Sequence, residues 1–280
     1  EDVRMHIPPE SVYVACGWGS NGIVSRIQND LKQRFPNMVP VGFPGVLEDS
    51  LVAYAYLESH IKFPLAYAQN TSPMAFRNGN GHSVDVNSFG ILPEQRNGYR
   101  KLREQPRVLF RKGDRTNLEF ALDLCANSAE AQIVVARISR EPTLALALAK
   151  IDKETAEMPA MVQRYGNHIQ TVQLSDSFLV PDFSWLISHR FAELEGQTFS
   201  NKRLTGQPIV AARQDILFRM NKSGVELKSE AKIQTAGTST DYNLDSPFLV
   251  CVKSRKTGVP YFAMWVDNSQ LMRPWQSAQR

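Results

Sequence analysis

Apolar and polar residues alternate strictly in six stretches of the chain. A period of two places successive side chains on opposite faces of an extended backbone, so each stretch predicts a β-strand that is half-buried or buried. The predicted strands are residues 83–86, 117–124, 171–174, 216–220, 225–233 and 248–252.

Three segments carry a helical pattern instead. Ile23, Ile27 and Leu31 lie four residues apart, which predicts an amphipathic helix over residues 22–35 that Pro36 ends. A run rich in leucine and alanine predicts a second helix over residues 143–153. Asp182 is a good helix N-cap and predicts a short third helix through residues 185–187.

The order of these elements predicts the fold class. Helices and strands do not alternate regularly, so a doubly wound parallel sheet is disfavoured and an α+β fold with much antiparallel strand is expected. The chain shows no internal repeat and no Gly/Ser linker, so we expect one domain over residues 1–280. With 42% hydrophobic and 21% charged residues, the composition excludes a collagen-like rod and a disulfide-dense mini-protein. The longest apolar runs, such as residues 144–149, are too short for a transmembrane helix.

Few residue patterns point to catalysis or metal binding. The three cysteines, Cys16, Cys125 and Cys251, lack CxxC spacing, and the chain has no HExxH, P-loop or GxGxxG motif, so we expect no cofactor and no metal. One enzymatic hypothesis is a cysteine hydrolase, because His168 follows Cys16 at a papain-like spacing. The glutamine and second cysteine of that signature are missing, and the alternative is that Cys16 is a small buried hydrophobe.

Positive charge is concentrated in one stretch of the chain. The net charge is +4, but residues 96–115 hold eight basic and two acidic residues, a net +6 that leaves −2 for the remainder. This predicts either an anion-binding face for a sulfated glycan or nucleic acid, or a solvated hairpin. We expect a basic, solvent-facing connection over residues 92–115. The candidate polyanion-binding residues are Arg96, Arg100, Lys101, Arg103, Arg107, Arg111 and Lys112.

The segment from Ala53 to Val86 resembles the central strand and following segment of the serpins. Serpins have a Tyr-Phe pair, an aromatic residue four positions beyond it, a Pro-Phe pair, a threonine five residues before a phenylalanine, and a Val-x-Val strand. The corresponding positions in this sequence are Tyr56-Leu57, Ile61, Pro64-Leu65, Thr71, Phe76 and Val84-x-Val86. The likeness resumes over residues 172–206 and 216–224, and in two closing strands at 246–250 and 261–266. It covers about residues 20–270 and implies a serpin-like α+β fold of mixed and antiparallel β-sheets with a few helices.

The chain also departs from the family pattern. Residues 1–22 diverge, and the helical N-terminal portion that serpins pack behind their large sheet has no counterpart, unless residues 1–22 replace part of it or another chain supplies it. The tryptophan expected at Ile61 is missing, and Asn268-Ser269 stands for a closing Asn-Pro. A second polypeptide that supplies the missing helices is therefore one expected partner.

Residues 224–246 correspond to the serpin reactive loop. In inhibitory serpins a protease cleaves this loop, which then inserts as an extra strand into the large sheet. The hinge here is Gly224, Val225, Glu226 and Leu227, with Lys222 where a glutamate is usual. Because residues 225–233 alternate with a clean period of two, we expect them to be a β-strand in the uncleaved chain.

Two functions follow from this loop. One is a non-inhibitory serpin-like binding or structural protein whose loop segment forms a strand in a relaxed sheet. The other is a serine-protease inhibitor of elastase-like specificity, cleaved at Ala236, Gly237 or Thr238. The bulky Leu227 and the missing N-terminal portion favour the first, because a metastable sheet needs a complete scaffold behind it. The resemblance further implies that the chain is not an enzyme, that its partner is a protease or an assembly protein, and that its location is extracellular.

Overall fold

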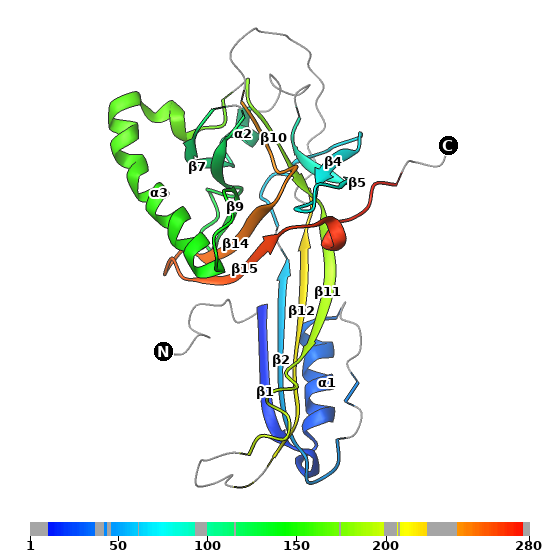
Figure 1. The fold of residues 1–280 in the computed structure, drawn as a ribbon. Helices are drawn as coiled ribbons and strands as arrows, with labels where there is room; N and C mark the ends of the chain where they lie inside the picture. Colours follow the sequence, from blue (N-terminus) through cyan, green and yellow to red (C-terminus); the bar gives the residue numbers. More distant parts are fainter. Residues whose placement is uncertain are drawn as a thin grey trace. The chain divides into compact units, whose positions relative to one another are not determined.

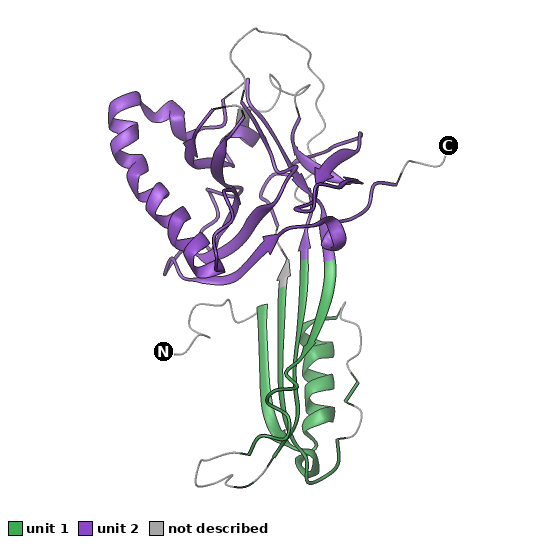
Figure 2. Cartoon of the chain, viewed as in Figure 1, with its two compact units in different colours: residues 1–59, 185–218 green, residues 60–184, 219–280 purple. Residues whose placement is uncertain are grey.

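The contacts within the chain divide it into two compact units (Figure 2). Unit 1 comprises residues 1–59 and 185–218, and unit 2 comprises residues 60–184 and 219–280. The computed structural model describes residues 11–36, 42–43, 46–60, 62–92, 100–114, 116–173, 175–198, 206, 208–222 and 240–276. The expectation of one domain across the whole chain stays a prediction.

Unit 1 is built on a four-stranded sheet in the order β1-β2-β12-β11 (Figure 1). Its strands are β1 (Val12–Trp18), β2 (Leu51–His60), β12 (Ile209–Met220) and β11 (Phe183–Arg190), of which β11 begins and β12 ends in unit 2. β1 and β2 pair antiparallel from Val12↔Leu57 to Trp18↔Leu51. The two central strands of this sheet, β2 and β12, are therefore far apart in the sequence.

Helix α1 (Ile23–Arg34) covers one face of this sheet, after a short 3₁₀ turn, η3 (Gly19–Asn21). Ile23, Ile27 and Leu31 are almost completely buried and pack with Tyr54 and Tyr56 in one core. The helix predicted over residues 22–35 is confirmed, because the apolar residues whose spacing predicted it form its buried face.

A five-stranded sheet in unit 2 has the order β15-β14-β9-β8-β7. Its strands are β7 (Arg107–Lys112), β8 (Glu119–Asp123), β9 (Ala131–Arg137), β14 (Phe248–Ser254) and β15 (Pro260–Val266). Helix α3 (Leu144–Tyr165) lies against this sheet, with Ala147, Ile151 and Met158 in its core. α3 is twice as long as the predicted second helix, and the hydroxyl of Thr143 caps its N-terminus by accepting a hydrogen bond from the Leu146 N–H (3.2 Å).

A second sheet of unit 2 has the order β13-β10-β6-β3. Its strands are β3 (Ala68–Gln69), β6 (Ser88–Ile91), β10 (Ser177–Pro181) and β13 (Asp241–Asn243). A separate hairpin joins β4 (Met74–Arg77) to β5 (Ser83–Val86) through a turn at residues 78–81, where Gly81 has a φ of 90°. The remaining short elements are α2 (Arg100–Arg103), η5 (Asn167–Gln170) and η6 (Ser269–Leu271).

Two sequence predictions about secondary structure are wrong. The helix expected after Asp182 is strand β11, because the Asp182 carboxylate does not cap a helix: it is buried, and one of its oxygens accepts a hydrogen bond from Gln69 Nε2 (3.3 Å). The strand expected at residues 171–174 is reduced to an isolated bridge between Thr171 and Arg107, directly after η5.

The basic connection after β6 is also more structured than expected. It contains β7, whose Val108, Leu109 and Phe110 are buried against the rest of the five-stranded sheet. The prediction of a wholly solvent-facing connection is therefore wrong for this stretch, since β7 pairs with β8 along its length.

Candidate functional sites

The reactive-loop equivalent, residues 224–246, starts after β12, contains β13 and ends just before β14. The structure describes the chain up to Asn221-Lys222 and again from Thr240. Outside the described residues lie the strand predicted over residues 225–233, the predicted hinge and the predicted scissile region: Gly224, Val225, Glu226, Leu227, Ala236, Gly237 and Thr238. The described residues therefore define the two points at which this segment is attached.

The C-terminal attachment point is held firmly in unit 2. β13 pairs parallel with β10, with Ser177 opposite Asp241. The Thr240 N–H donates to Asp176 Oδ1 (2.9 Å), and Arg111 Nη1 donates to Thr240 Oγ1 (2.9 Å). The chain that follows the loop is thus fixed to the strand next to it by backbone and side-chain bonds.

In the sheet of unit 1, β2 and β12 lie next to each other, with no strand between them. These strands are hydrogen-bonded neighbours, and Tyr54 Oη on β2 donates to Asp215 Oδ2 on β12 at 2.8 Å. Both residues are buried, and burial together with the Asp215 carboxylate raises the pKa of Tyr54. A buried, charge-assisted hydrogen bond therefore joins the two central strands.

Arg213 extends this polar cluster to the edge strand. Its Nε donates to Asp215 Oδ1 (3.0 Å), and its Nη2 donates to Ser188 Oγ on β11 (3.0 Å). The sequence analysis missed this cluster. The signal available was that Arg213 and Asp215 occupy alternate positions of one strand, which places both on one face.

Arg103 is an internal residue of unit 2. Its side chain is buried, and its Nη1 donates to the backbone carbonyls of Gln173 (2.5 Å) and Asp176 (3.0 Å). The structure therefore separates Arg103 from the exposed basic residues with which the sequence grouped it.

The other basic candidates are divided between the surface and internal contacts. Lys101, Arg107, Arg111 and Lys112 are exposed. Lys112 pairs with Glu154 of α3 (3.0 Å), and Arg107 donates to the side chain of Gln170. Arg96 and the side chain of Arg100 lie outside the described residues. Binding of a polyanion to this stretch stays a prediction.

A cavity of about 1180 Å³ opens between α3, β7 and the residues around β13. Met161 and Tyr165 give it an exposed apolar wall, while Arg111, Lys112 and Glu154 supply charge. His168 also lines it. Because this cavity borders Thr240, it lies directly beside the C-terminal attachment of the reactive-loop equivalent.

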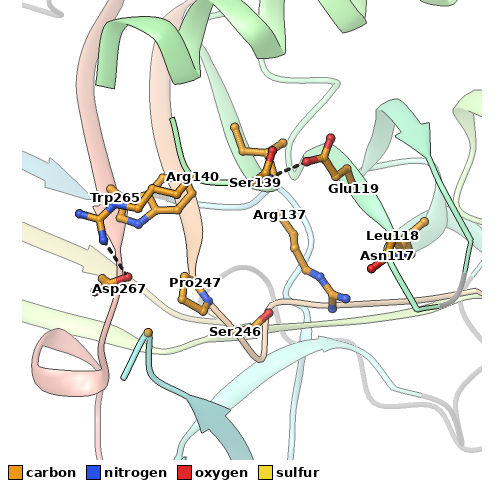
Figure 3. Close-up of a pocket in the computed structure, with 12 residues that line it drawn as sticks. Asn117, Leu118, Glu119, Arg137, Ser139, Arg140, Ser246, Pro247, Trp265 and Asp267 are labelled. Carbon is orange, nitrogen blue, oxygen red and sulfur yellow. Dashed lines mark hydrogen bonds and ion pairs between the residues drawn. The ribbon is translucent and has the colours of Figure 1, made fainter. Parts of the chain in front are cut away.

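A smaller cavity of about 620 Å³ lies at the ends of β9 and β15 (Figure 3). The side chains of Arg140 and Asp267 point toward each other there and form an ion pair of 3.4 Å. The Glu119 carboxylate accepts a hydrogen bond from the Ser139 N–H (2.6 Å), so it is already used by the protein. This cavity offers charge, the Trp265 ring and the hydroxyls of Ser139 and Ser246.

The two residues of the cysteine-hydrolase hypothesis belong to different units, and the hypothesis stays untested. Cys16 lies on β1 in unit 1, and His168 lies in η5 in unit 2. Cys16 is exposed, so the alternative that it is a small buried hydrophobe is wrong. Within the described ranges, no group of three His, Cys, Asp or Glu residues could hold a metal ion, and no helix is long and apolar enough to span a membrane.

No family model matches this chain, and no curated protein matches it by sequence. Among solved structures, native protease nexin-1 crystallised with heparin has a TM-score of 0.52 and 12% identity, over 88% of this chain and 65% of that one. Serpin48 of the insect Tenebrio molitor gives 0.53 and 12%, over 89% and 65%. Mouse protein-Z dependent protease inhibitor gives 0.53 and 13%, over 89% and 63%. The chain spans less than two thirds of the length of these serpins, and the serpin-like α+β fold predicted from the sequence is confirmed.

Proposed function

We propose that this chain, whose fold is serpin-like, is a non-inhibitory binding or structural protein that does not insert its loop between β2 and β12. The observation that carries the proposal is the buried hydrogen bond between Tyr54 and Asp215. An inserted strand would move β2 and β12 apart by a further strand spacing, about 4.8 Å, and break this bond. Leaving a buried donor or acceptor without a partner costs about 1–3 kcal/mol.

The hinge sequence supports the same proposal. Lys222 and Leu227 replace the acidic and small residues that inhibitors of this family carry, and a bulky inward side chain slows insertion into a packed sheet. β2 and β12 are already neighbours. In this proposal, a strand formed by residues 225–233 therefore does not lie between β2 and β12.

The proposed ligand is another protein, which this chain binds without modifying it chemically. The exposed part of the basic stretch, Lys101, Arg107, Arg111 and Lys112, is a second proposed binding surface, for a polyanion. Protease nexin-1, one of the similar serpins, was crystallised with heparin, which makes heparin the natural first probe. The competing function is inhibition of an elastase-like protease with cleavage at Ala236, Gly237 or Thr238, in the extracellular location that the resemblance implies.

The test is incubation of the chain with elastase, chymotrypsin, subtilisin and trypsin, followed by a denaturing gel. A non-inhibitory protein is cleaved or left intact, whereas an inhibitor gives a covalent complex that survives boiling. The melting temperature is measured before and after cleavage between residues 233 and 242. No large rise is expected. A covalent complex, or a rise of tens of degrees, would replace this proposal by the inhibitor function.

A further inference from the structure

The larger cavity of unit 2, between α3, β7 and the residues around β13, has an apolar wall that reaches the solvent. Met158, Met161 and Tyr165 follow one another at helical spacing on one face of α3. Met158 is buried, but Met161 is 44% and Tyr165 49% exposed. The buried side chains of Phe110 and Tyr242 also line the cavity. At about 1180 Å³ it is large enough for a small organic molecule, whose apolar surface would leave the water there.

The charged residues that line this cavity give it a net negative charge. Five are acidic and two are basic, a net −3 with His168 neutral: Asp114, Glu154, Glu157, Asp176, Asp241, Arg111 and Lys112. Arg164, whose guanidinium lies over the Tyr165 ring at 5.3 Å, is not a lining residue, and counting it still leaves −2. The sign is opposite to the net +4 of the whole chain. Charges of one sign in a cavity attract a ligand of the other sign.

Both basic side chains of the cavity already have protein partners. Lys112 pairs with Glu154 at 3.0 Å, and Arg111 Nη1 donates to Thr240 Oγ1 at 2.9 Å. Glu157 is exposed and, within the described ranges, forms neither a hydrogen bond nor an ion pair. The cavity therefore keeps a carboxylate that can receive a cation from outside.

We propose that this cavity binds an apolar cation, an organic group whose positive charge lies directly beside an apolar body. Glu157 precedes Met161 by four residues, so the free carboxylate and the exposed apolar wall are neighbours on α3. An anion would be repelled by the net charge. A neutral apolar ligand would cover the Glu157 carboxylate without giving it a partner, which is unfavourable. The site involves neither β2 nor the bond from Tyr54 to Asp215, so it does not depend on whether the loop inserts.

Two aromatic dyes of similar size and opposite charge test the sign of the ligand. Thioflavin T is a cation and anilinonaphthalene sulfonate is an anion, and the fluorescence of both rises when they leave water. We expect the full chain to bind one thioflavin T, at least about tenfold more tightly than the anionic dye. The affinity for thioflavin T should fall as the salt concentration rises.

Two pairs of variants place the dye in this cavity. Glu157→Gln should weaken thioflavin T binding about threefold, whereas Glu193→Gln, at an exposed position of unit 1, should not. Met161→Ser should weaken it at least about threefold, whereas Leu146→Ser should not, because Leu146 is similarly exposed on α3 (51%) but does not line the cavity. Circular dichroism checks that all four variants are folded.

Arg111→Gln separates this site from the proposed polyanion surface. Removing a positive charge from the wall should tighten thioflavin T binding, whereas retention on heparin should fall if Arg111 also binds a polyanion. Weaker thioflavin T binding in Arg111→Gln would contradict the proposal.

Two competitors distinguish the sources from which an apolar cation could come. A short peptide of alternating leucine and lysine represents a segment of a partner protein, and tetrabutylammonium represents a free organic cation. Displacement of thioflavin T by one of them supports the proposal and assigns the source. Displacement by neither, tighter binding of the anionic dye, or equal losses within either pair of variants overturns it.

Discussion

The hydroxyl of Tyr54 and the carboxylate of Asp215 are hydrogen-bonded at 2.8 Å although the residues are 161 positions apart in the chain. The bond closes the middle of the unit 1 sheet by linking β2 to β12. Because it is buried and involves an ionised acceptor, its contribution to stability exceeds that of an exposed polar contact.

Replacing Tyr54 by phenylalanine should therefore destabilise the protein by about 1.5–3 kcal/mol, the usual value for a hydrogen bond to a charged group. Urea unfolding measures the loss. The matched control is Tyr165→Phe, because Tyr165 is 49% exposed on α3 and should change stability by less than about 0.5 kcal/mol. Equal losses in the two variants would show that the bond between β2 and β12 contributes little.

Asp182 should make the stability of the protein fall as the pH rises. Burial raises the pKa of its carboxyl, and the hydrogen bond from Gln69 and the charges of Arg273 and Lys222 offset this only in part. Between the ordinary pKa of about 3.9 and the raised one, the folded state holds more protons than the unfolded state, so stability decreases through that window and stays lower above it.

The variant Asp182→Asn lacks this decrease. Its stability relative to the original protein should grow from pH 3 to pH 7, measured by urea unfolding at each pH. Asp85→Asn, at an exposed position of β5, serves as the control and should give a nearly constant difference. A constant difference for Asp182→Asn as well would contradict the prediction.

The basic residues of the stretch after β6 should separate into two classes. Arg103→Ala should lower the melting temperature, because two backbone carbonyls lose their buried donor, and should leave the salt concentration of elution from heparin unchanged. The double variant Lys101→Ala and Arg111→Ala should elute at lower salt with little change in melting temperature. If heparin retention is unaffected by the double variant, this stretch is not the polyanion site.

Thr143 should contribute a measurable part of the stability of α3. Its hydroxyl accepts the Leu146 N–H, so Thr143→Ala should cost about 1 kcal/mol in urea unfolding. Thr143→Ser keeps the hydroxyl oxygen and should retain most of the stability. A serine variant as unstable as the alanine variant would assign the loss to the methyl group instead.

The sequence predicted the elements whose pattern depends on near neighbours. The spacing of Ile23, Ile27 and Leu31 located α1, and the alternation of residues 248–252 located β14. Prediction from the sequence failed where a contact with a residue far along the chain determines the local structure. Asp182 has the side chain of a good helix cap, but in the fold it is buried beside Gln69, and the chain after it is extended.

The candidate sites show the same division. The charge of Arg103 is visible in the sequence, but the two carbonyls that bind it lie about 70 residues further on. The exposure of Cys16 was mispredicted because β1 is apolar on both faces, which indicates burial, while the described part of unit 1 covers only one of them. Nothing in the sequence pairs Tyr54 with Asp215, because the two residues lie 161 positions apart.

The position of β14 has a consequence for a chain cut in the reactive-loop equivalent. β14 lies inside its sheet, between β15 and β9, although the loop separates it in sequence from β9, β8 and β7. A single cut between residues 222 and 240 therefore produces two polypeptides that share one hydrophobic core. Unfolding of the cut protein releases two molecules from one, so by mass action its melting temperature should rise with protein concentration, whereas that of the intact chain should not.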